Sequence, residues 1–208
     1  MYSVKIPGLV SAISKKLIWR INTAQKVLFL TFDDGPIPDV TPKVLGILKD
    51  YNAKATFFGV GENMMRNSGL VERALTEGHV FGTHTYNHLN GWKTSHFSYL
   101  KNYLKAEQVF SSGLFRPPYG RITPRQIKSI HKRSKIVMWD VLSGDFDRNS
   151  SPEQCAGNVI ENAKPGSIIV FHDSLKAEKN MFYALRKTLE HFSNKGYRFE
   201  ALTDKWIN

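Results

Sequence analysis

The sequence predicts an α/β fold in which seven parallel strands form a closed or nearly closed barrel. Short hydrophobic runs alternate with helical patterns from residue 27 to the end, which is typical of βα units and a mainly parallel sheet. A length of 208 residues with 41% hydrophobic residues suits one domain with its own core. An open, doubly wound sheet is the alternative.

Hydrophobic runs mark the strands, and proline and glycine mark the helix boundaries. Thr41-Pro42, Thr123-Pro124 and Ser151-Pro152 each offer an N-cap residue followed by proline at the first helical position. Lys195-Gly196 is a stop signal near the end of the chain. In chain order, the predicted strands are Val27–Phe32, Ala55–Val60, Val80–Thr83, Leu114–Arg116, Ile136–Asp140, Ser167–Phe171 and Arg198–Leu202.

Residues 1–26 precede this alternation, and we expect them to pack on the barrel as an amphipathic segment. Lys15 and Lys16 interrupt its apolar positions, so the spacing suits a helix better than the unbroken apolar core of a secretory signal. We therefore expect a cytoplasmic protein. No run approaches the ~18 apolar residues of a transmembrane segment. The apolar positions are Leu9, Val10, Ile13, Leu17, Ile18 and Ile21.

Charge and cysteine content limit the classes of partner and site. The net charge of +11 permits binding to an anionic polymer, and residues 108–139 contain no acidic residue. The chain lacks the motifs of nucleic-acid-binding modules, so we expect no nucleic-acid partner and interpret the basic residues as a solvated helix face. The single cysteine, Cys155, excludes an internal disulfide and a cysteine-rich zinc site. Its helical surroundings predict a buried structural thiol.

Polar residues that could take part in catalysis or bind a metal lie at the ends of five of the predicted strands. The carboxyl ends of parallel strands share one face, where active sites of α/β proteins are built. The chain therefore gathers its reactive groups at one end of the barrel. In chain order they are Asp33 and Asp34, His84 and His88, Arg116 and Tyr119, Asp145, and His172.

The first two groups indicate a metal site. Adjacent carboxylates such as Asp33 and Asp34 disfavour each other's ionised form unless a cation lies beside them. His84 and His88, four residues apart, complete with an aspartate a set of two histidines and one carboxylate, which leaves positions open for water and substrate.

Three motifs resemble those of a known family. Thr31-Phe32-Asp33-Asp34-Gly35-Pro36, His84-Thr85-Tyr86-Asn87-His88 and Arg116-Pro117-Pro118-Tyr119-Gly120 are similar to the first three motifs of the polysaccharide deacetylases, the family four carbohydrate esterases. The resemblance runs from about residue 27 to 202. It implies a distorted, partly open (β/α)7 barrel related to the TIM barrel, with residues 27–208 as the catalytic domain. It also implies a divalent metal, usually zinc, with cobalt or nickel as alternatives.

The resemblance also assigns roles to the metal side of the site. Asp34, His84 and His88 would hold the metal. Asp33 would be the base that takes a proton from water bound at the metal, and Arg116 would pair with Asp33 and orient it.

On the opposite side, the resemblance makes His172 the acid that protonates the leaving group, with Asp145 as its partner. The backbone N–H of Tyr119 would help to stabilise the oxyanion. These roles agree with the chemistry of amide hydrolysis, which needs an activated nucleophile, a stabilised oxyanion and a protonated amine.

Several positions depart from the family pattern or lie beside it. Leu142 stands where many members have an aspartate, and Val170 replaces a usual leucine of the fifth motif. Neither change removes a catalytic group. Tyr86, Trp92 and Phe146 are candidates for a platform that stacks under a sugar ring.

The sequence therefore predicts a hydrolase that removes acetyl groups from N-acetylated, or O-acetylated, sugars of a polysaccharide or oligosaccharide. Two alternatives remain open. The same fold could hydrolyse a C–N bond in a small non-polymeric amide, or the chain could be a non-catalytic glycan-binding relative. The oligomeric state is open as well.

Overall fold

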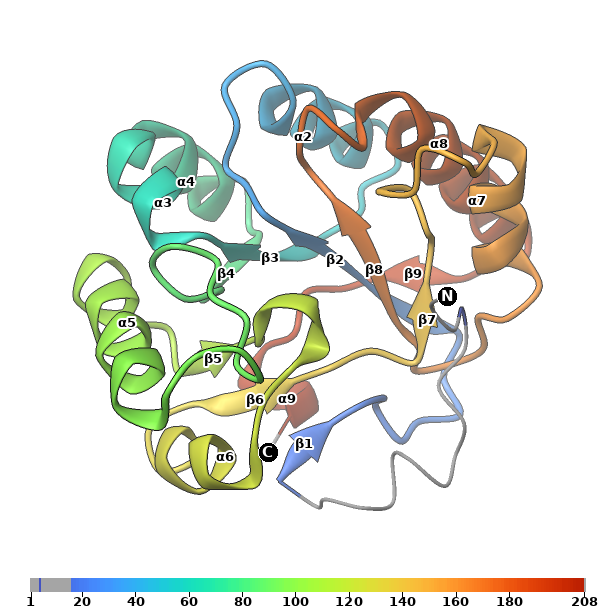
Figure 1. The fold of residues 1–208 in the computed structure, drawn as a ribbon. Helices are drawn as coiled ribbons and strands as arrows, with labels where there is room; N and C mark the ends of the chain where they lie inside the picture. The colour runs from blue at the N-terminus through green and yellow to red at the C-terminus, as the bar shows by residue number, and fades with distance from the viewer. Residues whose placement is uncertain (1–3, 5–15, 208) are drawn as a thin grey trace.

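A computed structural model describes residue 4 and residues 16–207, and it confirms a distorted, partly open barrel (Figure 1). The strands follow the order β1-β6-β5-β4-β3-β2-β8-β7, and β9 pairs with β2 outside this path. Every pairing between these strands is parallel. The strands are β1 Leu17–Ile18, β2 Val27–Asp33, β3 Ala55–Gly59, β4 Val80–Thr83, β5 Leu114–Phe115, β6 Lys135–Val137, β7 Val141–Leu142, β8 Ile168–His172 and β9 Arg198–Phe199.

Helices surround the sheet and connect successive strands (Figure 1). The longest, α8, packs against α7 on the same side of the barrel as α2. The helices are α2 Thr41–Asp50, α3 Gly61–Arg66, α4 Ser68–Thr76, α5 His96–Val109, the 3-10 turn η1 Pro118–Gly120, α6 Pro124–Ile130, α7 Pro152–Ile160, α8 Glu178–Asn194 and α9 Asp204–Ile207.

Two of the three predicted helix starts carry the expected cap. The side chains of Thr123 and Ser151 accept hydrogen bonds from the backbone N–H groups of Gln126 and Gln154, whose own side chains complete the capping boxes. Thr41 differs, because it is already the first residue of α2, and its hydroxyl donates to the Asp173 carboxylate over 2.6 Å. A tertiary contact has replaced the local cap.

The alternation of side chains along β2 separates the core from the site. Phe32 stacks on Phe57 of β3 and on Phe171 of β8, with ring centroids 5.0 and 5.8 Å apart, and Phe57 continues the stack to Phe81 of β4. This aromatic row packs into the largest hydrophobic cluster, together with side chains of α2, α7 and α8. Since successive side chains of a strand point to opposite faces, Asp33 points away from that cluster.

The predicted strand Ile136–Asp140 is wrong in its second half, because the chain leaves the β6 ladder at Met138 and resumes pairing only in β7. The cause is Arg116, a residue distant in sequence. Its Nε and one terminal nitrogen donate to the carbonyls of Val137 and Met138, over 3.2 and 2.8 Å. The Asp140 carboxylate meanwhile accepts from the backbone N–H of Ile168 over 2.8 Å.

The amphipathic helix predicted for the N-terminal segment is wrong for Leu17–Ile21. Leu17 and Ile18 form β1 beside β6, Arg20 makes an isolated bridge to Ser167, and the Ile21 N–H donates to Gly166. This segment therefore runs from the edge of β6 to the start of β8. The backbone groups at the edge of β6 offer hydrogen-bond partners, so Leu17 and Ile18 pair with them as a strand. Most of the remaining helix prediction concerns residues 1–3 and 5–15, which lie outside the described residues. Val4, which is described, does not belong to a helix. In residues 4 and 16–207, no helix is long and apolar enough to cross a membrane.

Candidate active site

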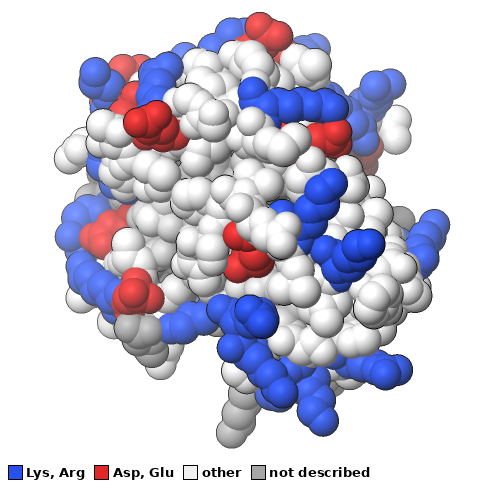
Figure 2. Space-filling model, turned by 90° about the vertical axis from the view of Figure 1, so that its left-hand side faces the viewer, with Lys and Arg blue, Asp and Glu red and all other residues white. Residues whose placement is uncertain are grey.

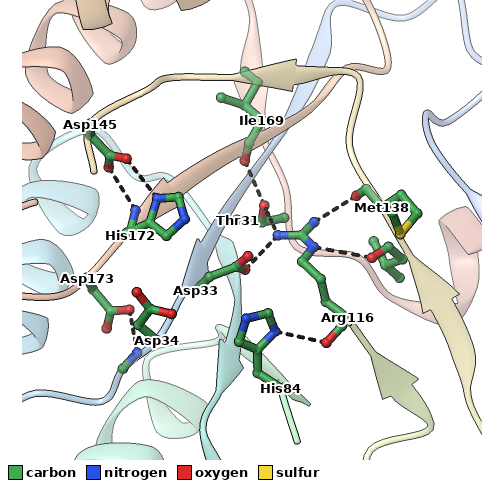
Figure 3. Close-up of polar contacts among 12 residues, drawn as sticks. Thr31, Asp33, Asp34, His84, Arg116, Met138, Asp145, Ile169, His172 and Asp173 are labelled. Carbon is green, nitrogen blue, oxygen red and sulfur yellow. Dashed lines mark hydrogen bonds and ion pairs between the residues drawn. The ribbon is translucent and has the colours of Figure 1, made fainter. Parts of the chain in front are cut away.

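A cavity of about 510 Å³ opens at the carboxyl ends of the strands and gathers residues singled out from the sequence. Figure 3 shows the polar contacts of several of them, among them Asp33, His84 and His172. Arg116 and Asp145 do not line this cavity; both are buried, with 0% and 1% exposure. Each binds a residue that does line it: Arg116 binds Asp33, and Asp145 binds His172. The predicted residues that line it are Asp33, Asp34, His84, His88, Tyr119 and His172.

Asp34, His84 and His88 bring one ligand atom each to within 4.8 Å of one another. Nδ1 of His84 lies 2.8 Å from the carbonyl oxygen of Arg116, so this nitrogen carries the proton and Nε2 keeps its lone pair for the cavity. Nε2 of His88 lies 3.2 Å from an Asp34 oxygen, and its Nδ1 lies 3.1 Å from the Tyr119 hydroxyl. Two histidines and a carboxylate with partners behind the rings are a donor set that fits a divalent metal such as zinc.

The ionisation of this group suits metal binding. Burial lowers the pKa of His84 to about 4, so its imidazole is neutral at physiological pH. Burial opposes the charged form of Asp34, but the hydrogen bond from His88 and the charge of His172 hold the pKa of this carboxyl well below its usual range. A neutral imidazole and an ionised carboxylate are the forms that bind a metal.

Asp33 is held by the buried guanidinium of Arg116. One terminal nitrogen of Arg116 donates to the Asp33 carboxylate over 2.8 Å and to the Thr31 hydroxyl over 2.7 Å. The guanidinium carbon also lies 4.2 Å from the ring centroid of Phe58. Val137 and Met138 accept from Nε and from the other terminal nitrogen, so each guanidinium nitrogen of Arg116 has a partner within the protein, and Asp33 has one defined orientation (Figure 3).

His172 and Asp145 form the second ion pair of the site. Nδ1 of His172 lies 2.7 Å from one Asp145 oxygen, and the backbone N–H of His172 donates to the other over 2.8 Å. Burial disfavours the imidazolium, but the charge and hydrogen bond of Asp145, with the charges of Asp34 and Asp33, raise the pKa of His172 to about 9. His172 therefore carries a proton at neutral pH, and its Nε2 remains available to a bound molecule.

The backbone around the site adopts a conformation that most residues avoid. Five non-glycine residues of the described chain have positive φ, and four belong to the site motifs: Asp34 at 84°, Thr85 at 58°, His88 at 56° and Tyr119 at 61°. Such conformations concentrate where surrounding contacts hold a functional geometry. Sequence patterns for strands and helices carry no signal for them.

Asp173 is the main residue of the site that sequence reasoning missed. It is fully buried and accepts from the Gly35 N–H over 3.0 Å and from the Thr41 hydroxyl over 2.6 Å. Burial, with a smaller contribution from the nearby Asp34 charge, raises the pKa of Asp173 to about 8. Its position directly after His172 was a usable signal. Its contacts hold the turn that presents Asp34.

The rest of the cavity lining consists of an apolar wall and a polar, basic part. The departures from the family pattern, Leu142 and Val170, form part of its apolar wall with Trp139. Arg121, Ser174 and Lys176 were not singled out as site residues and line it as well.

Of the three aromatic residues predicted to form a stacking platform, one lies in a position where it could meet a bound sugar. Phe146 lines the cavity and contacts the His172 ring, with centroids 5.1 Å apart. Tyr86 is wrong, because its ring is buried toward α5, with the Lys105 ammonium 3.6 Å from the ring centroid. Trp92 is exposed and does not line the cavity; the Arg121 guanidinium lies 5.2 Å from its ring centroid.

The cysteine prediction is confirmed. Cys155 is fully buried in α7, and burial raises the pKa of its thiol to about 12, so it is no nucleophile at physiological pH.

Comparison with known proteins agrees with this geometry. Residues 20–135 match the family model described as polysaccharide deacetylase, a segment that includes Asp33 to Tyr119 and ends before Asp145 and His172. A peptidoglycan-N-acetylglucosamine deacetylase of Bacillus cereus is 35% identical over 193 residues, which cover 89% of this chain and 91% of the relative.

Two further relatives are a solved structure of similar length and a longer protein that the chain matches in part. The crystal structure of the Bc1960 peptidoglycan N-acetylglucosamine deacetylase superposes with a TM-score of 0.88 at 34% identity, over 96% of this chain and 97% of that one. The peptidoglycan-N-acetylglucosamine deacetylase PgdA of Listeria monocytogenes is 35% identical over 209 residues, and the chain spans 41% of its length. The matched family model and the relatives of similar length together show that this chain belongs to the polysaccharide deacetylase family.

Proposed function

We propose that this protein is a metal-dependent deacetylase that hydrolyses the N-acetyl groups of N-acetylglucosamine residues in peptidoglycan. One observation carries the proposal: a single cavity contains the Asp34, His84 and His88 donor set, a carboxylate held by Arg116, and a histidine paired with Asp145. The names of the relatives of similar length support peptidoglycan as the polymer.

The chain would begin catalysis from the metal side. Asp34, His84 and His88 would hold Zn²⁺, which would supply a Lewis acid that lowers the pKa of a water molecule toward ~7. Asp33 accepts the proton of the attacking water, and the Arg116 contact of 2.8 Å holds this carboxylate in one orientation in the cavity. Tyr119 adds a second contribution, because its backbone N–H can donate to the oxyanion that forms as the water adds to the acetyl carbonyl.

The chain would complete catalysis from the opposite side. Nε2 of His172 donates its proton to the sugar nitrogen as the C–N bond breaks, because an amine anion is too poor a leaving group. Asp145 holds Nδ1 and stabilises the imidazolium before the transfer. The apolar side chains of Leu142 and Val170 line the same cavity and can pack against the acetyl methyl group.

Acetate release from metal-stripped protein tests the proposal. The substrates are peptidoglycan fragments, N-acetylglucosamine oligomers, acetylated xylan and a set of small amides, each assayed without metal and with zinc, cobalt or nickel. We expect metal-dependent release from the peptidoglycan fragments, abolished in His84→Ala and retained in His131→Ala, which removes an exposed histidine outside the cavity.

Other results would replace the proposal with an alternative. Release from small amides alone would favour a C–N hydrolase of the same fold, and release from acetylated xylan alone would favour an O-acetyl esterase. Glycan binding without release from any substrate would favour a non-catalytic relative. The cytoplasmic location expected from the sequence stays a prediction, which fractionation of the native cells would test.

A further inference from the structure

Two basic side chains of the cavity, Arg121 and Lys176, have no role in the proposed chemistry. Both line the cavity, yet they come from different parts of the fold: Arg121 follows η1, and Lys176 lies between β8 and α8. Within the part of the chain that the structure describes, neither forms an ion pair with a carboxylate. The acidic residues of the cavity already have partners, since Asp33 pairs with Arg116 and Asp34 belongs to the metal donor set.

Each of these cations is placed by an aromatic ring. The Arg121 guanidinium carbon lies 5.2 Å from the ring centroid of Trp92, whose indole N–H donates to the Ile122 carbonyl over 3.3 Å. The Gly91 N–H donates to the Arg121 carbonyl over 3.2 Å, and a β-carbon at Gly91 would come within 2.3 Å of that oxygen. The loop that carries Trp92 is therefore attached to the backbone of Arg121. A cation held against an aromatic face keeps its charge while losing some freedom.

Lys176 has a similar position on the acid side. Its ammonium nitrogen lies 5.9 Å from the ring centroid of Phe146, and Phe146 contacts His172. Lys176 and Phe146 also line a second cavity of about 410 Å³, together with Asp147 and Arg148. Two cations and one carboxylate line this second cavity, so its lining carries a net positive charge.

The wider surface agrees with this charge. Figure 2 shows Lys and Arg side chains spread over one face of the molecule, where they outnumber Asp and Glu. That general charge attracts any polyanion, whereas Arg121 and Lys176 line the cavity that contains the metal donor set and His172.

We infer that Arg121 and Lys176 bind carboxylate substituents on the sugars that flank the reacting N-acetylglucosamine, and so select an anionic glycan over a neutral one. The inference rests on the proposed function and narrows its substrate class. In peptidoglycan, every second sugar carries a lactyl group that ends in a carboxylate or continues into a peptide with carboxylates. One cation on the metal side and one on the acid side match a substituent on either side of the reacting sugar.

A comparison of matched substrates tests the inference. The probes are a fragment of alternating N-acetylglucosamine and N-acetylmuramic acid, the same fragment with its lactyl carboxylates converted to methylamides, the fragment with its peptides attached, and an N-acetylglucosamine oligomer of equal length. The readout is the ratio of kcat/KM for each carboxylate-bearing fragment to that for the methylamide, in wild type, Arg121→Gln and Lys176→Gln.

We expect each substitution to lower this ratio about tenfold, which corresponds to about 1.4 kcal/mol. Arg125→Gln and Lys128→Gln on α6 remove the same charge from exposed positions outside the cavity and should leave the ratio within twofold of wild type. A response with the lactyl fragment or with the peptide-bearing fragment identifies the source of the carboxylate, and either supports the inference.

Other outcomes would overturn it. A wild-type ratio near one, an unchanged ratio in both cavity variants, or an equal drop in the α6 variants would show that the carboxylate is not read by Arg121 and Lys176. If no probe releases acetate, the proposed function fails instead. In that case the inference is tested by binding alone. Dissociation constants for the lactyl fragment and its methylamide are measured by tryptophan fluorescence in wild type and the same four variants, and the preference for the carboxylate is expected to fall only in Arg121→Gln and Lys176→Gln.

Discussion

Asp145→Asn offers a test of the acid side of the site, because the structure shows how strongly this carboxylate acts on His172. The pKa of His172 is about 9 against an ordinary value of 6.5, although burial alone would lower it. Since one pKa unit corresponds to about 1.4 kcal/mol, its partners favour the imidazolium by at least about 3 kcal/mol. Asp145 contributes most, through its charge and its 2.7 Å contact.

Replacing the Asp145 carboxylate with an amide removes that charge, and Asp33 and Asp34 remain as weaker influences. We expect the pKa of His172 to fall toward 6.5 or below. Because the proposed acid must be protonated, the alkaline limb of kcat/KM moves down from about pH 9 by about 2.5 pH units. At pH 8 the protonated fraction falls from about 0.9 to about 0.03, a loss of about 30-fold that is nearly absent at pH 6.

The assay is acetate release from pH 5 to 10 with metal at saturation, with NMR titration of His172 in parallel. Asp147→Asn is a matched control, since this carboxylate lies two residues away and is not among the causes of the His172 shift. The same linkage affects stability: the raised pKa makes a contribution that is full below about pH 6.5 and is lost as the pH rises through about 9. An alkaline limb that stays within half a pH unit of wild type in Asp145→Asn would show that Asp145 does not set the pKa of the catalytic acid.

Three further changes test other contacts. Arg116→Met leaves a buried carboxylate unpaired and should lower the free energy of unfolding by about 3–5 kcal/mol in urea denaturation. The control Arg125→Met, on the exposed face of α6, should lower it by less than about 1 kcal/mol. Equal losses in the two variants would contradict a stabilising ion pair between Arg116 and Asp33. Tyr119→Phe removes the hydroxyl behind His88 and should weaken zinc binding about tenfold in competition with a chelator, and an unchanged affinity would show that this contact is incidental. Asp173→Ala leaves the Gly35 N–H and the Thr41 hydroxyl without their acceptor and should cost about 1–3 kcal/mol of stability, while a loss below about 0.5 kcal/mol would mean that the turn holds itself.

The sequence predicts the strands well, because their signal is local. The runs that became β2, β3, β4 and β8 are continuous hydrophobic segments buried on both faces, which is typical of parallel strands covered by helices. Capping boxes at Thr123 and Ser151 are equally local, since donor and acceptor lie three residues apart.

The errors arise where partners distant in sequence decide the structure. Nothing in Ile136–Asp140 shows that Arg116 will take two of its carbonyls. Leu17, Ile18 and Ile21 fit an apolar helix face and a strand equally well, and the free edge of β6 selects the strand.

The site shows the same division. The residues with chemistry could be predicted, because each lies directly after a strand and reactive residue types are distinctive. Asp173 was missed because its role depends on Gly35 and Thr41, more than 130 positions away. Tyr86 was misplaced because the turn at Thr85, with φ of 58°, directs the following ring toward α5 rather than into the cavity.

In the proposed mechanism, Asp33 acts as a base beside a metal that it does not hold. A comparison of wild type with Asp33→Asn for zinc stoichiometry and affinity, and for acetate release from peptidoglycan fragments, separates these two roles. We expect Asp33→Asn to bind zinc as wild type does and to release no acetate above background. Acetate release at the wild-type rate, or loss of zinc together with activity, would contradict it.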